Sequence, residues 1–184
     1  MQGVTLTTDR LVLRELREDD RAAVHEYGSD PEVVRYMPWG PNSEEDTRVF
    51  IERALARQLE DPRTAYEFAI ALRDDGRLVG GCGIHEFSLA NRSAFMGYCL
   101  RRDAWGDGYA TEAARALLSF GFESLGLHRM AATCDIENAA SIRVLEKVGM
   151  RREAQFREDT LLRGRWRDSY LYAILENEWK GRTP

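Results

Sequence analysis

The chain has 184 residues, of which 43% are hydrophobic and 31% are charged. This length and balance are typical of one globular domain, so we expect a single domain over residues 1–184 and exclude collagen-like, disordered and coiled-coil chains. The formal net charge of -5 disfavours direct nucleic-acid binding, because proteins that hold phosphate backbones are usually basic.

Three cysteines, Cys82, Cys99 and Cys134, lie far apart and form no C-x-x-C pair. We therefore expect neither a disulfide framework nor a metal site. The first residues carry no basic segment followed by an apolar core, and no apolar run approaches the roughly 20 residues of a membrane span. These features predict a protein of the reducing cytoplasm with no membrane partner.

The start of the chain predicts one strand followed by short helices. Apolar residues alternate through Leu6–Glu15, which indicates a strand. Acidic residues then begin a helix over Asp19–Tyr27. Asp30 and Pro31 begin a further helical turn, which is predicted to end before Pro38.

A longer helix is predicted to begin at Ser43. Asp46 stands three residues later, which is the spacing of a capping box. The apolar positions that follow recur at helical spacing: Phe50, Ile51, Ala54, Leu55 and Leu59.

Three consecutive strands are predicted in the middle of the chain. Tyr66–Leu72 alternates, with Phe68, Ile70 and Leu72 on one face. The Asp-Asp-Gly run at 74–76 indicates a hairpin turn into a second strand over 78–87, and a third strand follows over 94–100.

The last part of the chain alternates helix and strand before it ends in a hairpin. A helix is predicted over Tyr109–Leu125, a strand over Met130–Asp135, and a helix from Asn138 to Val148. The segments 151–162 and 168–175 indicate a final hairpin that turns at Arg163-Gly164.

This order of elements predicts an α/β (α+β) fold. Its core is one mixed, mostly antiparallel twisted sheet with helices on both faces. A parallel strand contact is expected where the helix after Gly108 crosses over the sheet.

The run Trp105-Gly106-Asp107-Gly108 links a predicted strand to a predicted helix. The unpaired N–H groups of a first helical turn form an anion site, and glycine allows a phosphate to approach the backbone closely. A plain tight turn is the simpler interpretation of two glycines, but the strand-to-helix context favours a phosphorylated ligand. A dinucleotide fingerprint would need glycine where Thr111 stands, and a P-loop would need a nearby lysine.

A second informative helix begins about 30 residues after this turn. Asn138 and Ser141 share one helix face at its N-terminus. A plain helix cap is the common use of such an Asn, and a local backbone hydrogen bond is the common use of such a Ser.

Together the two runs resemble the GNAT (Gcn5-related N-acetyltransferase) superfamily. The W-G-x-G-Y-A-T-E-A run at 105–113 is similar to its acyl-coenzyme A pyrophosphate loop, and the N-x-x-S-x-x-x-L-E-K-x-G run at 138–149 is similar to its following helix. The opening T-x-R-L-x-L-R, the R-G-R-W-R-D-S run and the E-N-E-W run resemble the Rim-type branch, the ribosomal-protein N-terminal alanine acetyltransferases. The likeness covers nearly the whole chain.

The resemblance implies a GNAT fold and acetyl-CoA as co-substrate, with no metal. It implies that acetyl-CoA is bound by Tyr98, Cys99, Leu100, Trp105, Gly106, Asp107, Gly108, Tyr109, Ala110, Thr111, Asn138 and Arg143.

The chain departs from the family pattern at two positions. Relatives often have Gln or Arg where Asp103 stands, so any side-chain contact to phosphate is lost or passes to Arg101 or Arg102. Many relatives also carry a candidate base, a Glu, where Phe95 stands, so no base can be transferred from that position.

The expected chemistry is acetyl transfer to a primary amine. Ser141 matches the family position for a hydroxyl near the departing thiolate, and Tyr98 is an alternative acid. The backbone from Tyr98 to Leu100 is expected to supply N–H groups to the thioester oxygen. Glu158 or Glu86 is our candidate base, although a solvated surface carboxylate is the commoner role of either, and His85 is a tempting alternative.

The acceptor amine is left open between several classes. The branch implies a protein N-terminal alanine or serine, whereas an aminoglycoside, a polyamine or a free amino acid would suit a small-molecule enzyme. A non-catalytic acyl-CoA-binding module is the alternative from another class. The segments Tyr36–Asn42 and Phe156–Arg167 are expected to shape the acceptor pocket, with Trp39 and Trp166 as walls. Relatives are monomers or homodimers.

Overall fold

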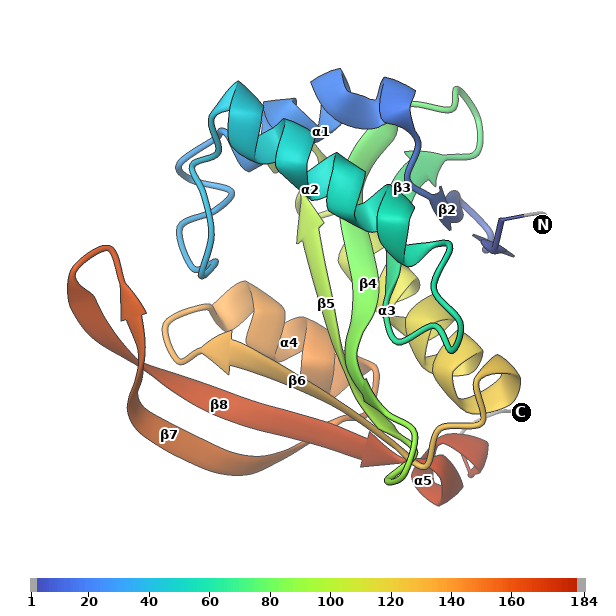
Figure 1. Ribbon diagram of the computed structural model, residues 1–184. Coiled ribbons are helices and arrows are strands. Elements are labelled where there is room, and N and C mark those ends of the chain that lie inside the picture. Colours follow the sequence, from blue (N-terminus) through green and yellow to red (C-terminus); the bar gives the residue numbers. More distant parts are fainter. Residues whose placement is uncertain (1–2, 182–184) are drawn as a thin grey trace.

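In the computed structural model, which describes residues 3–181, one eight-stranded sheet organises the chain (Figure 1). The strands are ordered β1-β2-β3-β4-β5-β6-β8-β7. Every neighbouring pair is antiparallel except β5 and β6, which run parallel. The strand bounds are β1 Thr5–Thr7, β2 Leu11–Glu15, β3 Tyr66–Leu72, β4 Leu78–Ser88, β5 Ser93–Leu100, β6 Arg129–Asp135, β7 Arg151–Leu162 and β8 Arg165–Leu175.

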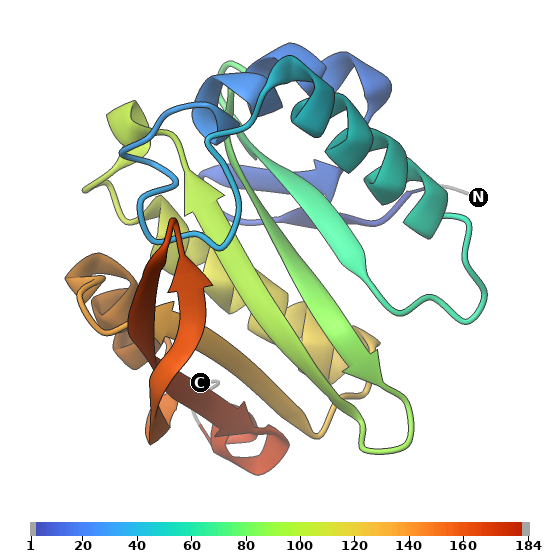
Figure 2. The same ribbon diagram turned by 60° about the vertical axis from the view of Figure 1, so that its left-hand side comes forward.

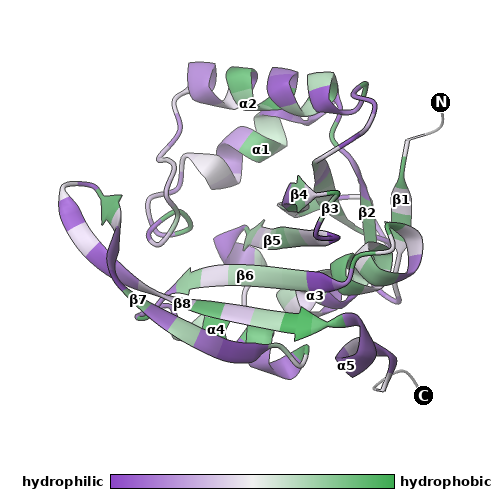
Figure 3. Cartoon of the chain, turned by 60° about the horizontal axis from the view of Figure 1, so that its bottom comes forward, coloured by the Kyte–Doolittle hydropathy of each residue, from purple (hydrophilic) through white to green (hydrophobic). Residues whose placement is uncertain are grey.

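Helices cover both faces of this sheet, which confirms the fold class predicted from the sequence (Figure 3). On one face, α1 (Arg21–Gly28) packs against β4 and α2 (Glu44–Arg57) packs against β3. On the other face, α3 (Tyr109–Ser119) packs against β5 and α4 (Ala139–Lys147) packs against β6. The helix of α3 continues as one π-helical segment, and a short α5 that the sequence did not predict follows β8; their bounds are Phe120–Ser124 and Glu176–Lys180.

Three predicted elements differ in the structure. The single strand expected over Leu6–Glu15 is a hairpin of β1 and β2, because the Thr8 Oγ1 accepts from the Leu11 N–H at 2.9 Å and turns the chain. The helical turn expected after Asp30 is a series of non-helical turns. The last strand begins at Arg165 rather than Asp168, because its ladder with β7 starts directly after the turn.

The predicted capping box begins α2. The Asp46 N–H donates to Ser43 Oγ at 3.1 Å, and the Ser43 N–H donates to Asp46 Oδ2 at 2.9 Å. Ile51 and Ala54 of the predicted apolar stripe are buried, as helical spacing requires. Leu59 is 81% exposed instead, because the helix ends at Arg57 and Leu59 no longer lies on its inner face.

Strand alternation divides the buried residues into two cores. Phe68 and Ile70 of β3 point toward α3, together with most of the large apolar side chains of the protein. Ala69, between them, points toward α1 and α2, where the core is smaller. The α1/α2 face therefore carries less side-chain volume, and this difference leaves room for a cavity.

The parallel pair β5 and β6 is joined only at one end. Its ladder consists of Ser93 with Arg129, Ala94 with Met130, and Phe95 with Ala131. Beyond these pairs both strands continue, β5 to Leu100 and β6 to Asp135, and they diverge (Figure 1). The sheet therefore has an open edge in its middle, next to the start of α3.

Candidate active site

The open edge of β5 presents backbone groups that have no strand partner. The Arg101 N–H donates to the Val79 carbonyl of β4 at 2.8 Å, so by alternation the N–H groups of Tyr98 and Leu100 point the other way, toward β6. The ladder to β6 has already ended at this height. This is where N–H donors for a thioester oxygen were predicted. Cys99 differs, because its backbone faces Gly81 on β4.

The glycine turn lies directly after this edge and begins α3. Gly106 and Gly108 have φ of +90° and +83°, which a residue with a Cβ rarely adopts. Apart from its chain neighbours, no atom of residues 3–181 lies within 4 Å of a Cβ built on Gly106, so the turn faces open space. In the described part of the chain no side chain caps α3, and its N-terminal N–H groups are therefore available to an anion. These features fit the diphosphate of an acyl-CoA.

Arg10, from the turn between β1 and β2, braces this segment and was not singled out in the sequence. Its guanidinium donates to the Asp107 carbonyl at 2.9 Å and to Glu112 Oε2 at 2.8 Å, and it lies over the Tyr109 ring. Burial alone would raise the pKa of Glu112, but the hydrogen bonds from Thr8 and Arg10 outweigh it and hold that pKa below its usual value. The brace therefore consists of charged partners.

The arginines that were expected to take over the phosphate contact are held elsewhere. Arg101 is paired with Glu26 of α1 and with Asp103, and Arg77 also reaches Asp103 at 3.0 Å. Arg102 lies 3.6 Å from Asp30. In the structure it is Arg10 that lies against the glycine turn, with Nη2 3.5 Å from a Cβ built on Gly108, while a contact of Arg101 or Arg102 with phosphate stays a prediction.

Two hydroxyl groups meet across the open edge. The Tyr98 Oη lies 3.0 Å from Ser141 Oγ, and Asn138 Oδ1 accepts from the Ser141 N–H at 3.1 Å. Asn138 thus caps α4 as predicted. Burial raises the pKa of Tyr98 although the hydrogen bond with Ser141 opposes this, so the phenol stays protonated near neutral pH. The remaining predicted coenzyme contacts lie nearby in the glycine turn and the first turn of α3, except Arg143, which is exposed on α4.

On the opposite face of the sheet lies a cavity of about 800 Å³ between α1, α2 and strands β3 to β5. Its floor is formed by Gly81, Gly83 and Gly97, which carry no side chains. A Cβ at Gly81 would lie 2.7 Å from the Tyr27 hydroxyl, and one at Gly83 would lie 2.8 Å from the Glu67 carboxylate. The glycines therefore give both side chains the space in which they lie.

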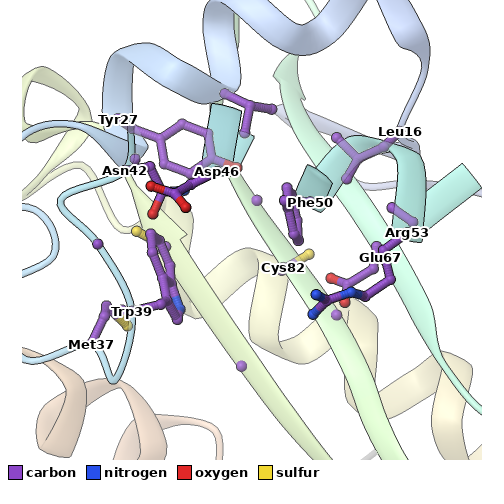
Figure 4. A pocket seen from close by; sticks show the side chains of 18 of the residues that line it. Leu16, Tyr27, Met37, Trp39, Asn42, Asp46, Phe50, Arg53, Glu67 and Cys82 are labelled. Atoms are coloured by element: carbon purple, nitrogen blue, oxygen red, sulfur yellow. The ribbon is translucent and has the colours of Figure 1, made fainter. Parts of the chain in front are cut away.

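Figure 4 shows how the labelled side chains are distributed around this cavity. Glu67 and Arg53 lie toward one end, and Phe50 and Cys82 lie in the middle. Tyr27, Trp39, Asn42 and Asp46 lie toward the other end. Trp39 and the segment around it line the cavity as predicted, whereas the exposed Trp166 does not.

The loop that carries Trp39 is fastened by the tip of the last hairpin. The Arg163 guanidinium donates to the carbonyls of Val34 at 3.0 Å, Trp39 at 3.3 Å and Gly40 at 2.9 Å. It also donates to the Arg35 carbonyl at 3.2 Å. Figure 2 shows this loop beside the hairpin tip. Both segments that were expected to shape the pocket therefore contribute, the second through Arg163.

Neither of the two candidate carboxylate bases lines the cavity. Glu86 lies in a β-bulge of β4 with a φ of +51°, and it is exposed and does not line the cavity. Glu158 is exposed on β7, where its N–H donates to Asp168 at 2.9 Å. The structure does not bring either carboxylate together with Ser141 or Tyr98.

The cavity instead contains Glu67 and His85, and Glu67 was missed in the sequence. His85 Nδ1 lies 3.3 Å from Glu67 Oε1, and Arg57 Nη1 lies 3.7 Å from the same oxygen. The Glu67 side chain is only 13% exposed. A charged residue within an otherwise apolar strand, Tyr66–Leu72, was the one available indication in the sequence.

Within residues 3–181, the structure contains no helix that is long and apolar enough to cross a membrane.

Comparison with known proteins adds three findings. A family model described as an acetyltransferase (GNAT) domain matches residues 10–151. The chain is 38% identical to the uncharacterised N-acetyltransferase YnaD of Bacillus subtilis, over 95% of this chain and 98% of the relative. A crystal structure of a GNAT-family acetyltransferase from Bacillus anthracis is 37% identical, with a TM-score of 0.84 over 95% of this chain and 99% of that one.

A more distant likeness concerns the fold alone. The structure of spermidine N-acetyltransferase from Vibrio cholerae in complex with CoA and spermine has a TM-score of 0.83 at 20% identity, and it covers 94% of this chain and 99% of that one.

Proposed function

The chain belongs to the GNAT acetyltransferase family and is an N-acetyltransferase, and from this premise we propose that it moves acetyl from acetyl-CoA to a primary amine held in the 800 Å³ cavity. We propose a single acetyltransferase domain over residues 1–184 that works in the cytoplasm. One chain forms both the coenzyme side and the acceptor side of the proposed site, so a monomer is sufficient for activity. In a homodimer, neither protomer would need a residue of its partner in the site.

One observation carries this proposal. The N–H groups of Tyr98 and Leu100 point into the gap between β5 and β6, with the glycine turn at one end of that gap. The neighbouring residue Gly97 forms part of the cavity floor. An acyl chain anchored at the glycine turn would therefore reach the floor of the cavity through the open edge of the sheet.

The chain's own residues suit the proton transfers that acetyl transfer requires. A free α-amino group has a pKa of about 7.7–8.0 and a lysine of about 10.4, so an acceptor amine must lose a proton before it attacks. Backbone N–H groups on the open edge would stabilise the negative oxygen of the thioester. We propose that Ser141, held by Tyr98, gives a proton to the departing sulfur.

The charges of the cavity favour a protein N-terminus over a polycation. Its carboxylates are Asp46 and Glu67, and its guanidinium groups are Arg53 and Arg57, so the charges balance. A polyamine or an aminoglycoside gains most from a pocket with net negative charge. A peptide that begins with alanine or serine presents one amine and several carbonyl groups, which suits a mixed and partly aromatic pocket.

A thiol-release screen tests this proposal directly. The purified full-length protein is supplied with acetyl-CoA and with peptides that begin in Ala or Ser, polyamines, aminoglycosides or free amino acids. We expect thiol release with the peptides and a mass gain of one acetyl group on their N-terminus. Release with polyamines alone would show a small-molecule enzyme, and no release with any amine would contradict the proposed function.

A further inference from the structure

His85 lines the cavity from β4, the strand next to β5 and its open edge. It lies on β4 opposite Phe95 of β5, on the same face as Gly83 and Gly97. Among the described residues, and apart from the chain neighbours of Gly97, only His85 Nε2 lies within 4 Å of a Cβ built on Gly97, at 3.9 Å. This nitrogen therefore lies above the residue that directly precedes Tyr98, whose N–H points into the gap.

The other ring nitrogen of His85 faces a carboxylate. Glu67 Oε1 lies 3.3 Å from Nδ1, and the floor glycine Gly83 leaves space for both side chains. Glu67 is itself fixed by its place opposite Gly83 and by Arg57 at 3.7 Å. A carboxylate at Nδ1 favours the tautomer with its proton on that nitrogen and leaves the lone pair on Nε2.

We propose that His85 Nε2 is the base that takes the proton from the acceptor amine, and that Glu67 is a positioning residue that orients the ring and stabilises its protonated form. This inference rests on the proposed function and names a residue for one of its steps. The geometry is that of a base oriented by a third group, with the reacting atoms on the far side of the ring.

The protons balance in this scheme. Of the three protons on the acceptor ammonium, one goes to His85 Nε2 before attack, one stays in the amide, and one leaves nitrogen for water. The amine lone pair forms the new C–N bond as the C–S bond breaks. The departing sulfur takes a proton from Ser141, whose hydroxyl regains one through water. Loss of the proton from Nε2 to solvent resets the site.

Three other titratable groups of the cavity do not compete for this role. Burial raises the pKa of the Tyr27 phenol, of Cys82 and of Cys99, the last to about 12, so these groups stay protonated near neutral pH. The charged and titratable groups around His85 come from α1, α2, β3, β4 and β5: Tyr27, Asp46, Arg53, Arg57, Glu67, Cys82, Tyr98 and Cys99.

The test compares substitutions at His85 with a matched histidine outside the cavity. His85→Gln keeps a polar group but removes the base, and His85→Ala also makes space for an added imidazole. Glu67→Gln removes only the negative charge that faces His85 Nδ1. The control is His128→Gln, because His128 is 58% exposed and also lies beside a glutamate, 4.0 Å from Glu176. Rates are measured from pH 6 to pH 10, and acetyl-CoA binding is measured by calorimetry.

We expect His85→Gln to lower kcat by about 10²- to 10⁴-fold, the usual contribution of a positioned base, without a change in acetyl-CoA affinity. The unmodified protein should show a fall in kcat toward low pH, and this fall should disappear in His85→Gln and move to lower pH in Glu67→Gln. Imidazole should restore activity to His85→Ala, which a purely structural role would not allow. His128→Gln should behave as the unmodified protein.

Three outcomes would overturn the inference. These are a His85→Gln variant within twofold of the unmodified kcat, a pH profile of that variant with the same acidic limb, or no rescue of His85→Ala by imidazole. If the His85 variants do not fold, the test compares the dependence of kcat on pH in the unmodified protein and in Glu67→Gln. Identical pH profiles of these two proteins would refute the scheme. If the protein acetylates an amine but gives one of these results, the proposed function stands and only the assignment of His85 as the base is wrong.

Discussion

The hydroxyl groups of Tyr98 and Ser141 lie 3.0 Å apart and join β5 to α4 where the sheet opens. Tyr98 Oη also donates to the Ser141 carbonyl at 3.3 Å. Both hydroxyl groups carry a proton, because burial keeps the phenol protonated, so either can donate in the 3.0 Å contact. When Tyr98 donates, the Ser141 proton is free to be given to a departing sulfur. The pair therefore lies on the coenzyme side of the sheet, where the departing sulfur is expected.

We predict that Ser141→Ala lowers kcat by about 10²-fold, at the lower end of what a positioned acid contributes, and leaves acetyl-CoA affinity unchanged. Tyr98→Phe should have a smaller effect, and the double variant should be no worse than Ser141→Ala alone, because Tyr98 acts through Ser141. Steady-state kinetics and calorimetry measure both quantities, with Ser119→Ala on α3 as the control. An unchanged kcat would remove Ser141 from the mechanism.

The glycine turn gives a second prediction, about coenzyme binding. Gly108→Ala forces a Cβ onto a residue with φ of +83°, which costs on the order of 1–3 kcal/mol and tilts the N–H groups of the first helical turn. We expect acetyl-CoA to bind about tenfold more weakly, the effect of roughly 1.4 kcal/mol. Calorimetric titration of acetyl-CoA measures this change.

The matched control is Gly76→Ala, in the turn between β3 and β4. Gly76 has a φ of +72°, and among the described residues outside its chain neighbours no atom lies within 4 Å of an added Cβ. Gly76→Ala should lose a similar amount of stability and keep its affinity for acetyl-CoA. Equal weakening in both variants would show that backbone strain, and not the place of the turn, explains the effect.

Arg163 gives a third prediction, about the acceptor. Its guanidinium holds the loop that carries Trp39 through carbonyl groups, and one hydrogen bond to a charged group contributes about 1.5–3 kcal/mol. We expect Arg163→Ala to raise the KM for the acceptor about tenfold, which needs only about 1.4 kcal/mol. The KM for acetyl-CoA should not change, since the glycine turn lies elsewhere.

Arg165→Ala is the comparison for Arg163→Ala, because Arg165 is an exposed arginine just after the same turn. It should leave both KM values unchanged. If Arg163→Ala raised the two KM values together, the hairpin tip would support the whole fold and not the acceptor loop in particular.

Local sequence patterns were sufficient for many of the individual elements. The Ser43–Asp46 capping box and the alternation of Phe68, Ile70 and Leu72 predicted α2 and β3, because hydrogen bonds and burial at these residues are decided by near neighbours. The prediction of one strand over Leu6–Glu15 was wrong, because the Thr8 side chain closes a turn that alternation does not reveal.

The coenzyme side of the site was accessible for the same reason, since the glycine turn and the cap of α4 are local. The acceptor side was accessible only in part, because Trp39 and His85 were named from the sequence but Glu67 and the contacts of Arg163 were not. Glu67 and His85 meet only through the register of β3 and β4, and Arg163 reaches the loop at Val34 from the far end of the chain. Strand register and long-range contacts depend on the whole fold, so single residues did not reveal them.

Arg14 and Asp20 give a last prediction, about stability and its dependence on pH. The Arg14 guanidinium donates twice to the Asp20 carboxylate, both times at 2.7 Å, and the Arg17 N–H donates to it at 2.8 Å. Burial would raise the pKa of Asp20, but these hydrogen bonds outweigh it and lower that pKa below its usual value. The side chains of the two residues are 20% and 8% exposed.

A carboxylate whose pKa is lower in the folded state stabilises the protein above its unfolded pKa, about 3.9, and this contribution is lost as the pH falls through the folded value. We expect Asp20→Asn to lower the free energy of unfolding by about 2 kcal/mol at pH 7, between the roughly 1 kcal/mol of an exposed pair and the roughly 3–5 kcal/mol of a fully buried one. The difference from the unmodified protein should shrink as the pH falls below about 4, where Asp20 of the unfolded chain becomes protonated, and it should vanish once the pH falls through the lower folded pKa, where Asp20 is protonated in both states. Urea unfolding at several pH values measures it, with the exposed neighbour substitution Asp19→Asn as the control. A difference that stayed constant down to pH 2 would mean that the Asn variant loses packing rather than the ion pair.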